Sequence, residues 1–267
     1  MKQGLLENFM TQDTKRNKGS SITRVLEILE AISEAKHPPS PLDLSLALDI
    51  PKPSIHRLIQ LLEKEGYVKV DLHGGLLVGG RVKQLLFNVW ENEKFRIERF
   101  SILEKLSNKI GETCGIAILQ DNHMLYVDRI QTNWPLQVYL PVGSTVPVWC
   151  TSSGKLFLSH LSAEKRKNIL KNIPITQYTK NTITDLNLLE SEIQRIGVTN
   201  LGTDNEEFIA GMVACSVPIL HPNGEIIACL YTHAPSIRKS LDDLISYQDA
   251  LRDAANDLNT YIKNSID

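Results

Sequence analysis

Apolar side chains between residues 20 and 66 recur at the spacing of short helices. The first run begins at Ser20 or Ser21, either of which suits a helix N-cap, and repeats every three or four residues. Two further runs follow, separated by the turn at Asp49-Ile50-Pro51. The inward positions of the three predicted helices are Ile22, Val25, Leu26, Leu29 and Ile32, then Leu44, Ala47 and Leu48, then Ile55, Leu58, Ile59 and Leu62.

The period changes after Gly66, a residue suited to the position that follows a helix. Residues 67–70 and 76–78 are predicted strands, joined by a turn at residues 72–75. Three short helices and a hairpin within about 60 residues are typical of a winged helix-turn-helix. We therefore predict a flexible leader at residues 1–19, a winged helix-turn-helix domain at 20–80 and a linker helix at 81–94.

The remainder, residues 95–267, mixes strand and helix patterns and is predicted to be one α+β domain. A helix is expected from residue 95 to about residue 110. Strands are expected at 114–119, 124–130, 137–140, 212–220 and 226–233, and further helices at 153–160, 163–171, 185–196 and 241–262. The fold class is therefore α+β, with an N-terminal winged helix-turn-helix joined by a helix to a larger α+β domain.

The third predicted helix has a polar face that a DNA reader could use. In a helix-turn-helix the N-terminal residues of this helix meet base edges in the major groove. Arginine can pair with guanine and glutamine with adenine, and a proline ring can touch a thymine methyl group. The candidate DNA-binding residues are Lys52, Pro53, Ser54, His56, Arg57 and Gln60.

A solvated helix face is the alternative interpretation, and charge does not decide between the two. Residues 1–80 contain ten basic and ten acidic side chains, and the whole chain has a formal net charge of −2. The acidic residues lie mainly on the first helix and at the far end of the third, away from its N-terminus. The basic start of the third helix therefore stays available for phosphates and bases.

Composition narrows the class of protein. The four cysteines lie far apart with no C-x-x-C, which disfavours a zinc site and a disulfide framework. Apolar runs are strand-sized, and the N-terminus lacks the apolar segment of a signal peptide. We expect a soluble cytoplasmic protein with no membrane partner and no cofactor.

Several ordered motifs resemble the IclR family of bacterial transcriptional regulators. Residues 50–68, IPKPSIHRLIQLLEKEGYV, are similar to the family's helix-turn-helix. Downstream, the similarity continues in Gly111-Glu112-Thr113, Tyr126-Val127-Asp128-Arg129, residues 146–155, Asp204-Asn205-Glu206-Glu207, Gly211 and Pro218. The resemblance extends from about Ser20 to Ile262.

This resemblance implies a GAF-like (profilin-like) effector-binding domain that controls DNA binding by a homodimer or homotetramer. It implies a double-stranded DNA operator, a small organic effector, such as a carboxylate or an aromatic compound, and a regulator rather than an enzyme, with repression favoured. The positions that match the family's pocket lining are Val138, Val146, Ser152, Ser153, Asp204, Met212, Ala214, Tyr231 and His233.

The pocket positions also have plain structural interpretations. Ser152-Ser153-Gly154 at a helix start offers backbone N–H groups to an anion, but Ser152 could simply cap that helix. Asp204 could close a turn, and His233 could be a half-buried strand residue. Tyr231 and His233 stand where family members often carry small residues, and Ala214 where many have cysteine, so either a smaller pocket or a different ligand is expected.

Two other functions fit parts of the sequence. Ser152 to Lys155 match the S-x-x-K motif of serine hydrolases, and Thr203-Asp204-Asn205 imitates their S-D-N, but no K-T-G follows. A DNA-binding scaffold whose second domain only oligomerises is the other alternative. It predicts that no ligand raises the melting temperature.

Overall fold

The computed structural model describes residues 20–35, 37–90, 93–221 and 223–264. The chain divides into two compact units, Met1–Phe95 and Arg96–Asp267. The predicted leader, 1–19, lies outside the described residues.

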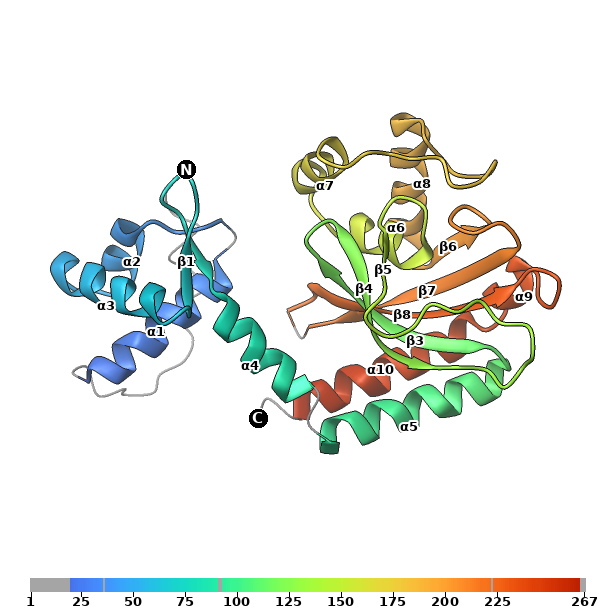
Figure 1. Ribbon diagram of the computed structural model, residues 1–267, viewed down its shortest axis with the longest axis horizontal. Helices are drawn as coiled ribbons and strands as arrows, with labels where there is room; N and C mark the ends of the chain where they lie inside the picture. Colours follow the sequence, from blue (N-terminus) through green and yellow to red (C-terminus); the bar gives the residue numbers. More distant parts are fainter. Residues whose placement is uncertain (1–19, 36, 91–92, 222, 265–267) are drawn as a thin grey trace. The chain divides into compact units, whose positions relative to one another are not determined.

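The N-terminal unit contains the three predicted helices and the hairpin (Figure 1). Helices α1 (Ser21–Glu34), α2 (Pro41–Ala47) and α3 (Lys52–Lys64) pack around one core with strands β1 (Val68–Val70) and β2 (Leu76–Val78). The strands pair antiparallel, and α4 (Gly80–Trp90) follows them. This arrangement confirms the helix-turn-helix prediction.

Local chemistry sets each boundary around α3. Asp49 turns the chain with a positive φ of 52°, a conformation that aspartate tolerates better than most residues. Pro53 lies in the first helical turn, where its missing N–H leaves no hydrogen bond unmade. Gly66 adopts a φ of 77° after the last turn. In the hairpin turn, Asp71 Oδ1 accepts from the backbone N–H groups of His73 and Gly75.

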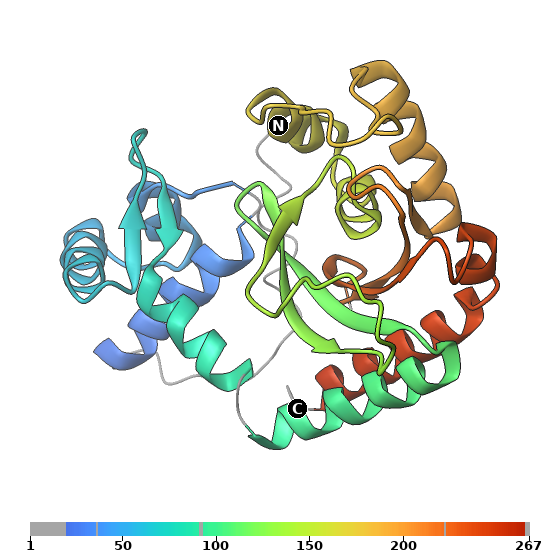
Figure 2. The ribbon, with the colours of Figure 1, turned by 45° about the vertical axis from the view of Figure 1, so that its right-hand side comes forward.

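The C-terminal unit is built on a six-stranded antiparallel sheet of order β5-β4-β3-β8-β7-β6. Its strands are β3 (Thr113–Gln120), β4 (His123–Ile130), β5 (Thr145–Pro147), β6 (Gly202–Asn205), β7 (Met212–Leu220) and β8 (Ile226–Pro235). Figures 1 and 2 show α5 (Glu93–Ile110) and α10 (Gln248–Asn264) side by side along one face of this sheet. On its other side lie α6 (Ser152–Ser159), α7 (Ala163–Lys171) and α8 (Leu186–Thr199).

Two of the predicted elements were wrong. Residues 137–140 form no strand, because the carbonyls of Val138 and Leu140 accept from the guanidinium of Arg129 and not from a neighbouring strand. The long helix expected at 241–262 is two helices, α9 (Leu241–Ile245) and α10, separated by a tight turn in which the Tyr247 N–H donates to the carbonyl of Leu244. The linker helix ends at Trp90, earlier than expected. Strands β5 and β6 were not predicted.

Candidate functional site

The candidate DNA-binding residues form the outer face of α3. Lys52, Pro53, His56, Arg57 and Gln60 are exposed, and Ser54 is partly exposed. The first turn of α3 carries no acidic residue. At the opposite end of the helix, Arg81 pairs with Glu65 at 3.2 Å and lies over the ring of Tyr67. The basic start of the helix is thus accessible to a partner, while its far end is tied to the start of α4.

The sheet of the C-terminal unit brings most of the predicted pocket residues onto one face. Directly paired residues in adjacent strands point the same way. Asp204 pairs with Ala214 and Ala214 with His233, so these three form one row across β6, β7 and β8. Met212 and Tyr231 lie two residues along their strands from this row and share its face.

A second row on the same face contains two glycines that make room for larger groups. It runs Gly202, Ser216, Tyr231, Gly115, Arg129. A Cβ on Gly202 would lie 2.2 Å from the carbonyl oxygen of Ser152 at the start of α6, and one on Gly115 would lie 2.5 Å from the hydroxyl of Tyr231. The glycines therefore let α6 and the tyrosine ring lie close to the sheet.

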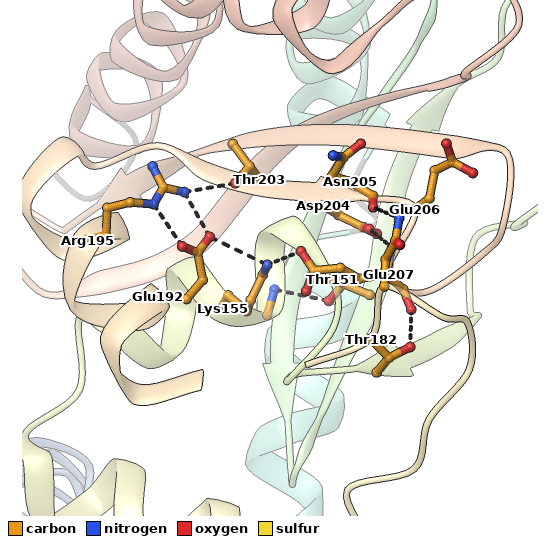
Figure 3. A network of polar contacts seen from close by, with 12 residues as sticks. Thr151, Lys155, Thr182, Glu192, Arg195, Thr203, Asp204, Asn205, Glu206 and Glu207 are labelled. Carbon is orange, nitrogen blue, oxygen red and sulfur yellow. Dashed lines mark hydrogen bonds and ion pairs between the residues drawn. The ribbon is translucent and has the colours of Figure 1, made fainter. Parts of the chain in front are cut away.

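The start of α6 is held by a buried ion-pair network (Figure 3). Lys155 is 0% exposed; its Nζ contacts Glu207 Oε1 directly and lies 3.7 Å from Glu192 Oε1. Glu192 in turn pairs with Arg195 at 2.8 Å. Breaking one partner of such a network is strongly destabilising, because it leaves an uncompensated buried charge. The network therefore fixes α6 against the β6–β7 turn.

Asp204 lies beside this network and is fully buried. Its Oδ1 accepts from the Glu207 N–H at 2.7 Å, whereas its Oδ2 has no hydrogen-bond partner among the described residues. Burial, and then the negative charge of Glu207, raise the pKa of Asp204 to about 7. Burial likewise raises the pKa of Glu207, against the opposing effect of Lys155. Asp204 is thus poised to take up or release a proton near neutrality.

Several other buried polar atoms on this face lack hydrogen-bond partners within the described part of the chain. Leaving a buried polar group unsatisfied costs about 1–3 kcal/mol, so a cluster of them needs a reason. Burial, and then the charge of Arg129, lower the pKa of His233 to about 3, which keeps its ring neutral. Besides Asp204 Oδ2, these atoms are Arg129 Nε, Ser216 Oγ, Tyr231 Oη, and both ring nitrogens of His233.

The other predicted pocket residues have more ordinary surroundings. Val146 is a core residue on β5, paired with Met124. Val138 is half-buried in the loop after β4. Ser152 and Ser153 are buried at the start of α6, but Ser152 is not the cap: the cap is Thr151, whose hydroxyl accepts from the Gly154 N–H at 3.2 Å. His233 is 3% exposed and thus fully buried, not half-buried.

Sequence reasoning missed four residues of this region: Arg129, Ser216, Lys155 and Glu207. Arg129 is a charged residue inside an apolar strand, and Ser216 follows Ala214 at the two-residue spacing of one sheet face. Both signals were readable from the sequence. Lys155 is held by Glu207 and Glu192, so it is not a free base for Ser152. The S-x-x-K match therefore has a structural explanation.

Among the residues that the structure describes, no group of three or more His, Cys, Asp or Glu side chains could hold a metal ion. Within the same residues, no helix is both long enough and apolar enough to cross a membrane. All four cysteines are free and buried.

A helix-turn-helix unit followed by an α+β unit is the two-domain architecture of a transcription regulator. The family model described as "Bacterial transcriptional regulator IclR C-terminal" matches residues 89–260, and the "IclR helix-turn-helix domain" matches residues 21–72. The chain belongs to the IclR family of bacterial transcriptional regulators. Its members regulate transcription, so the chain is not an enzyme.

Individual relatives agree with this assignment. The chain is 32% identical over 240 residues to the probable transcriptional regulator SauR of Cupriavidus necator, covering 90% of this chain and 95% of that protein. It is 24% identical to the transcriptional repressor AllR of Escherichia coli K12, covering 90% and 89%. The inducer-binding domain of PobR from Acinetobacter, solved as a double mutant with 3-hydroxybenzoic acid, superposes with a TM-score of 0.55 and 27% identity. That superposition covers 60% of this chain and 94% of the domain.

Proposed function

We propose that the protein is a ligand-responsive, sequence-specific repressor of transcription. Its DNA-binding domain comprises residues 20–80, its linker 81–94 and its effector domain 95–267. The observation that carries the ligand response is the set of buried, unsatisfied polar atoms on one sheet face, from Asp204 Oδ2 to Arg129 Nε. A bound molecule with polar groups would satisfy these atoms, as is usual in small-molecule sites.

DNA recognition is assigned to the exposed face of α3. Arg57 and Gln60 are the candidates for paired contacts with guanine and adenine, and Ser54, His56 and Pro53 lie near enough to the helix start to contact bases. Lys52 is the candidate for a phosphate contact. An operator with two related half-sites is expected, since a symmetric homodimer or homotetramer presents two such helices.

The effector is assigned as a small organic acid, aromatic or aliphatic. The PobR domain was solved with 3-hydroxybenzoic acid, which supports this class for a related domain. Tyr126 and Tyr231 stack with centroids 4.4 Å apart beside the unsatisfied atoms, and their rings offer an apolar wall. The lining would include Val138, Val146, Ser152, Ser153, Asp204, Met212, Ala214, Tyr231 and His233. Repression is supported by the relationship to the repressor AllR.

A ligand can change DNA affinity only if it binds one arrangement of the DNA-binding domains more tightly than another. We assign the transmission to α4, whose first residues are tied to the end of α3 through Arg81, Glu65 and Tyr67.

The test is a thermal-shift screen of small carboxylates, followed by operator binding with each compound that binds. A tight effector should raise the melting temperature by mass action and change operator affinity. Binding without any change in operator affinity would contradict the proposed ligand response. A screen in which no compound raises the melting temperature would favour the scaffold.

A further inference from the structure

Arg129 is a buried cation with unused hydrogen-bonding capacity. Its side chain lies on β4 and the residue is 8% exposed. Two of its nitrogens donate to the carbonyls of Leu140 and Val138, each at 2.8 Å, and so hold the loop after β4. The third nitrogen, Nε, is buried without a partner, and within the described residues no carboxylate pairs with this guanidinium. By contrast, the preceding residue, Asp128, is paired with Arg99 at 2.6 Å.

Two neutral polar groups on the same sheet face as this cation also lack hydrogen-bond partners among the described residues. Gly115 lies between Arg129 and Tyr231 in the sheet, and the absence of a side chain there lets the tyrosine hydroxyl reach across β3 towards β4. His233 is parallel to the Tyr231 ring, with centroids 6.0 Å apart. The hydroxyl can donate one hydrogen bond, and the neutral imidazole can donate one more.

The opposite end of the same face is less suited to an anion. Helix α6 begins there, but Thr151 already accepts from Gly154, and the charge of Lys155 is compensated by Glu207 and Glu192. Asp204 adds a third carboxyl group. The acidic group of a ligand at this end would be repelled by these carboxyl groups. At Arg129 the same group would neutralise a buried charge that no carboxylate among the described residues pairs with. Buried charges are stable in proteins when they are paired.

We propose that Arg129, Tyr231 and His233 form the subsite that binds the acidic group of the effector. Arg129 Nε and the Tyr231 hydroxyl donate to the oxyanion, and His233 donates through one ring N–H. The polar end at Ser152, Ser153 and Asp204 then receives an uncharged donor or acceptor of the ligand. This inference rests on the proposed ligand pocket and adds the orientation of the ligand within it.

The same guanidinium that would bind the ligand holds the loop after β4. An oxyanion at Nε would restrain the side chain that grips the carbonyls of Val138 and Leu140. The bound acid should therefore order this loop, and protection of its backbone from hydrogen exchange should increase when an acid binds.

The decisive variant is Tyr231→Phe, because it removes only a hydroxyl that has no hydrogen-bond partner among the residues that the structure describes. The matched control is Thr232→Val on the opposite face of the same strand, where the hydroxyl donates to the carbonyl of Thr113 at 3.0 Å. The probes are carboxylic acids and their uncharged amides, starting with 3-hydroxybenzoate and 3-hydroxybenzamide. Binding is measured by calorimetry and thermal shift on the full chain, together with Arg129→Gln and Arg129→Lys.

The expected result is that acids bind the wild-type protein more tightly than their amides. Tyr231→Phe should weaken acid binding about tenfold, as expected for one lost hydrogen bond to a charged group, without lowering the melting temperature of the free protein. Arg129→Gln should remove the preference for acid over amide, and Arg129→Lys should restore part of it. Thr232→Val should lower the melting temperature and keep the preference.

Three results would overturn the inference, and they separate it from the proposed function. If amides bind as tightly as acids, or if Tyr231→Phe and Arg129→Gln keep the full preference for acids, the pocket stands and the anion lies elsewhere. If neither acids nor amides nor uncharged aromatic compounds bind the wild-type protein, the ligand pocket itself is wrong.

Discussion

The clearest energetic prediction concerns Asp204→Asn. Asparagine keeps the oxygen that accepts from the Glu207 N–H, and it removes the charge. The pKa of Asp204 is raised from 3.8 to about 7, mainly by burial. The unfolded chain therefore loses its proton near pH 4, while the folded chain keeps it until about pH 7. Ionisation of Asp204 thus costs stability as the pH rises through this window, and the cost is complete above it.

The magnitude follows from the linkage between protonation and folding. Each pH unit within the window lowers the free energy of unfolding of the wild-type protein by about 1.36 kcal/mol. Between about pH 5 and pH 7 the wild-type protein should lose about 3 kcal/mol that the asparagine variant keeps. Near pH 5 the free energy of unfolding of Asp204→Asn should therefore be equal to that of wild type or slightly higher. At pH 8 it should be clearly higher.

Urea unfolding of both proteins, followed by a probe in the C-terminal unit, measures this difference. The control is Asp243→Asn, because hydrogen bonds from Ser240 hold the pKa of this exposed capping carboxyl below its usual value. Asp243 is ionised in both the folded and the unfolded chain from pH 5 to pH 8. The difference in free energy of unfolding between Asp243→Asn and wild type should therefore not change with pH. A difference for Asp204→Asn that stays constant from pH 5 to pH 8 would show that Asp204 is ionised at all these pH values, contrary to the reasoning.

Three further predictions concern recognition, the buried network and a helix cap. Arg57→Ala should weaken operator binding by about 1–3 kcal/mol, and more than Lys64→Ala at the far end of α3, in fluorescence anisotropy; equal small losses would mean that α3 is not the reading helix. Lys155→Met should destabilise the C-terminal unit by about 3–5 kcal/mol in urea unfolding, because Glu207 is left buried and unpaired. Adding Glu207→Gln should recover part of this loss, and additive losses in the double variant would contradict the pairing. Ser40→Ala should cost about 1 kcal/mol by removing the capping box of α2, and an unchanged melting temperature would refute that assignment.

The DNA-binding unit was predictable from sequence because its signals are local. Capping at Ser20, the proline in the first turn of α3 and the glycine at position 66 all act within a few residues of where they appear. Helical periodicity correctly places the buried face of α3, since Ile55, Leu58, Ile59 and Leu62 all lie in the core of the unit. In the first two helices it was wrong at three positions, because Ile22, Leu26 and Ala47 are exposed. The first helix instead turns Ile28 and Ala31 into the core, together with the predicted Ile32.

The effector unit was less predictable because its site depends on pairing between distant strands. Asp204, Ala214 and His233 meet only because β6, β7 and β8 are neighbours in one register. The family resemblance identified these positions. Hydrophobic periodicity alone predicts that a segment is a strand, but it does not predict which strand lies beside it. Arg129 and Tyr231 become neighbours through Gly115, which depends on the sheet order and not on any local pattern.

The segment 137–140 shows the limit of strand propensity. Its composition suits a strand, but two of its backbone carbonyls accept hydrogen bonds from the guanidinium of Arg129, and the segment is a loop. These two hydrogen bonds join residues that are nine and eleven positions apart in the chain, and strand propensity takes no account of such contacts.

The most direct test of the whole account is operator binding in the presence of an acid that binds the protein. DNA selected by the purified protein from a random pool would be titrated by fluorescence anisotropy with and without that acid. The account predicts that the acid changes the affinity of the wild-type protein for this DNA, and that the same concentration has a much smaller effect on Tyr231→Phe. An affinity that is the same with and without every acid that binds would contradict it.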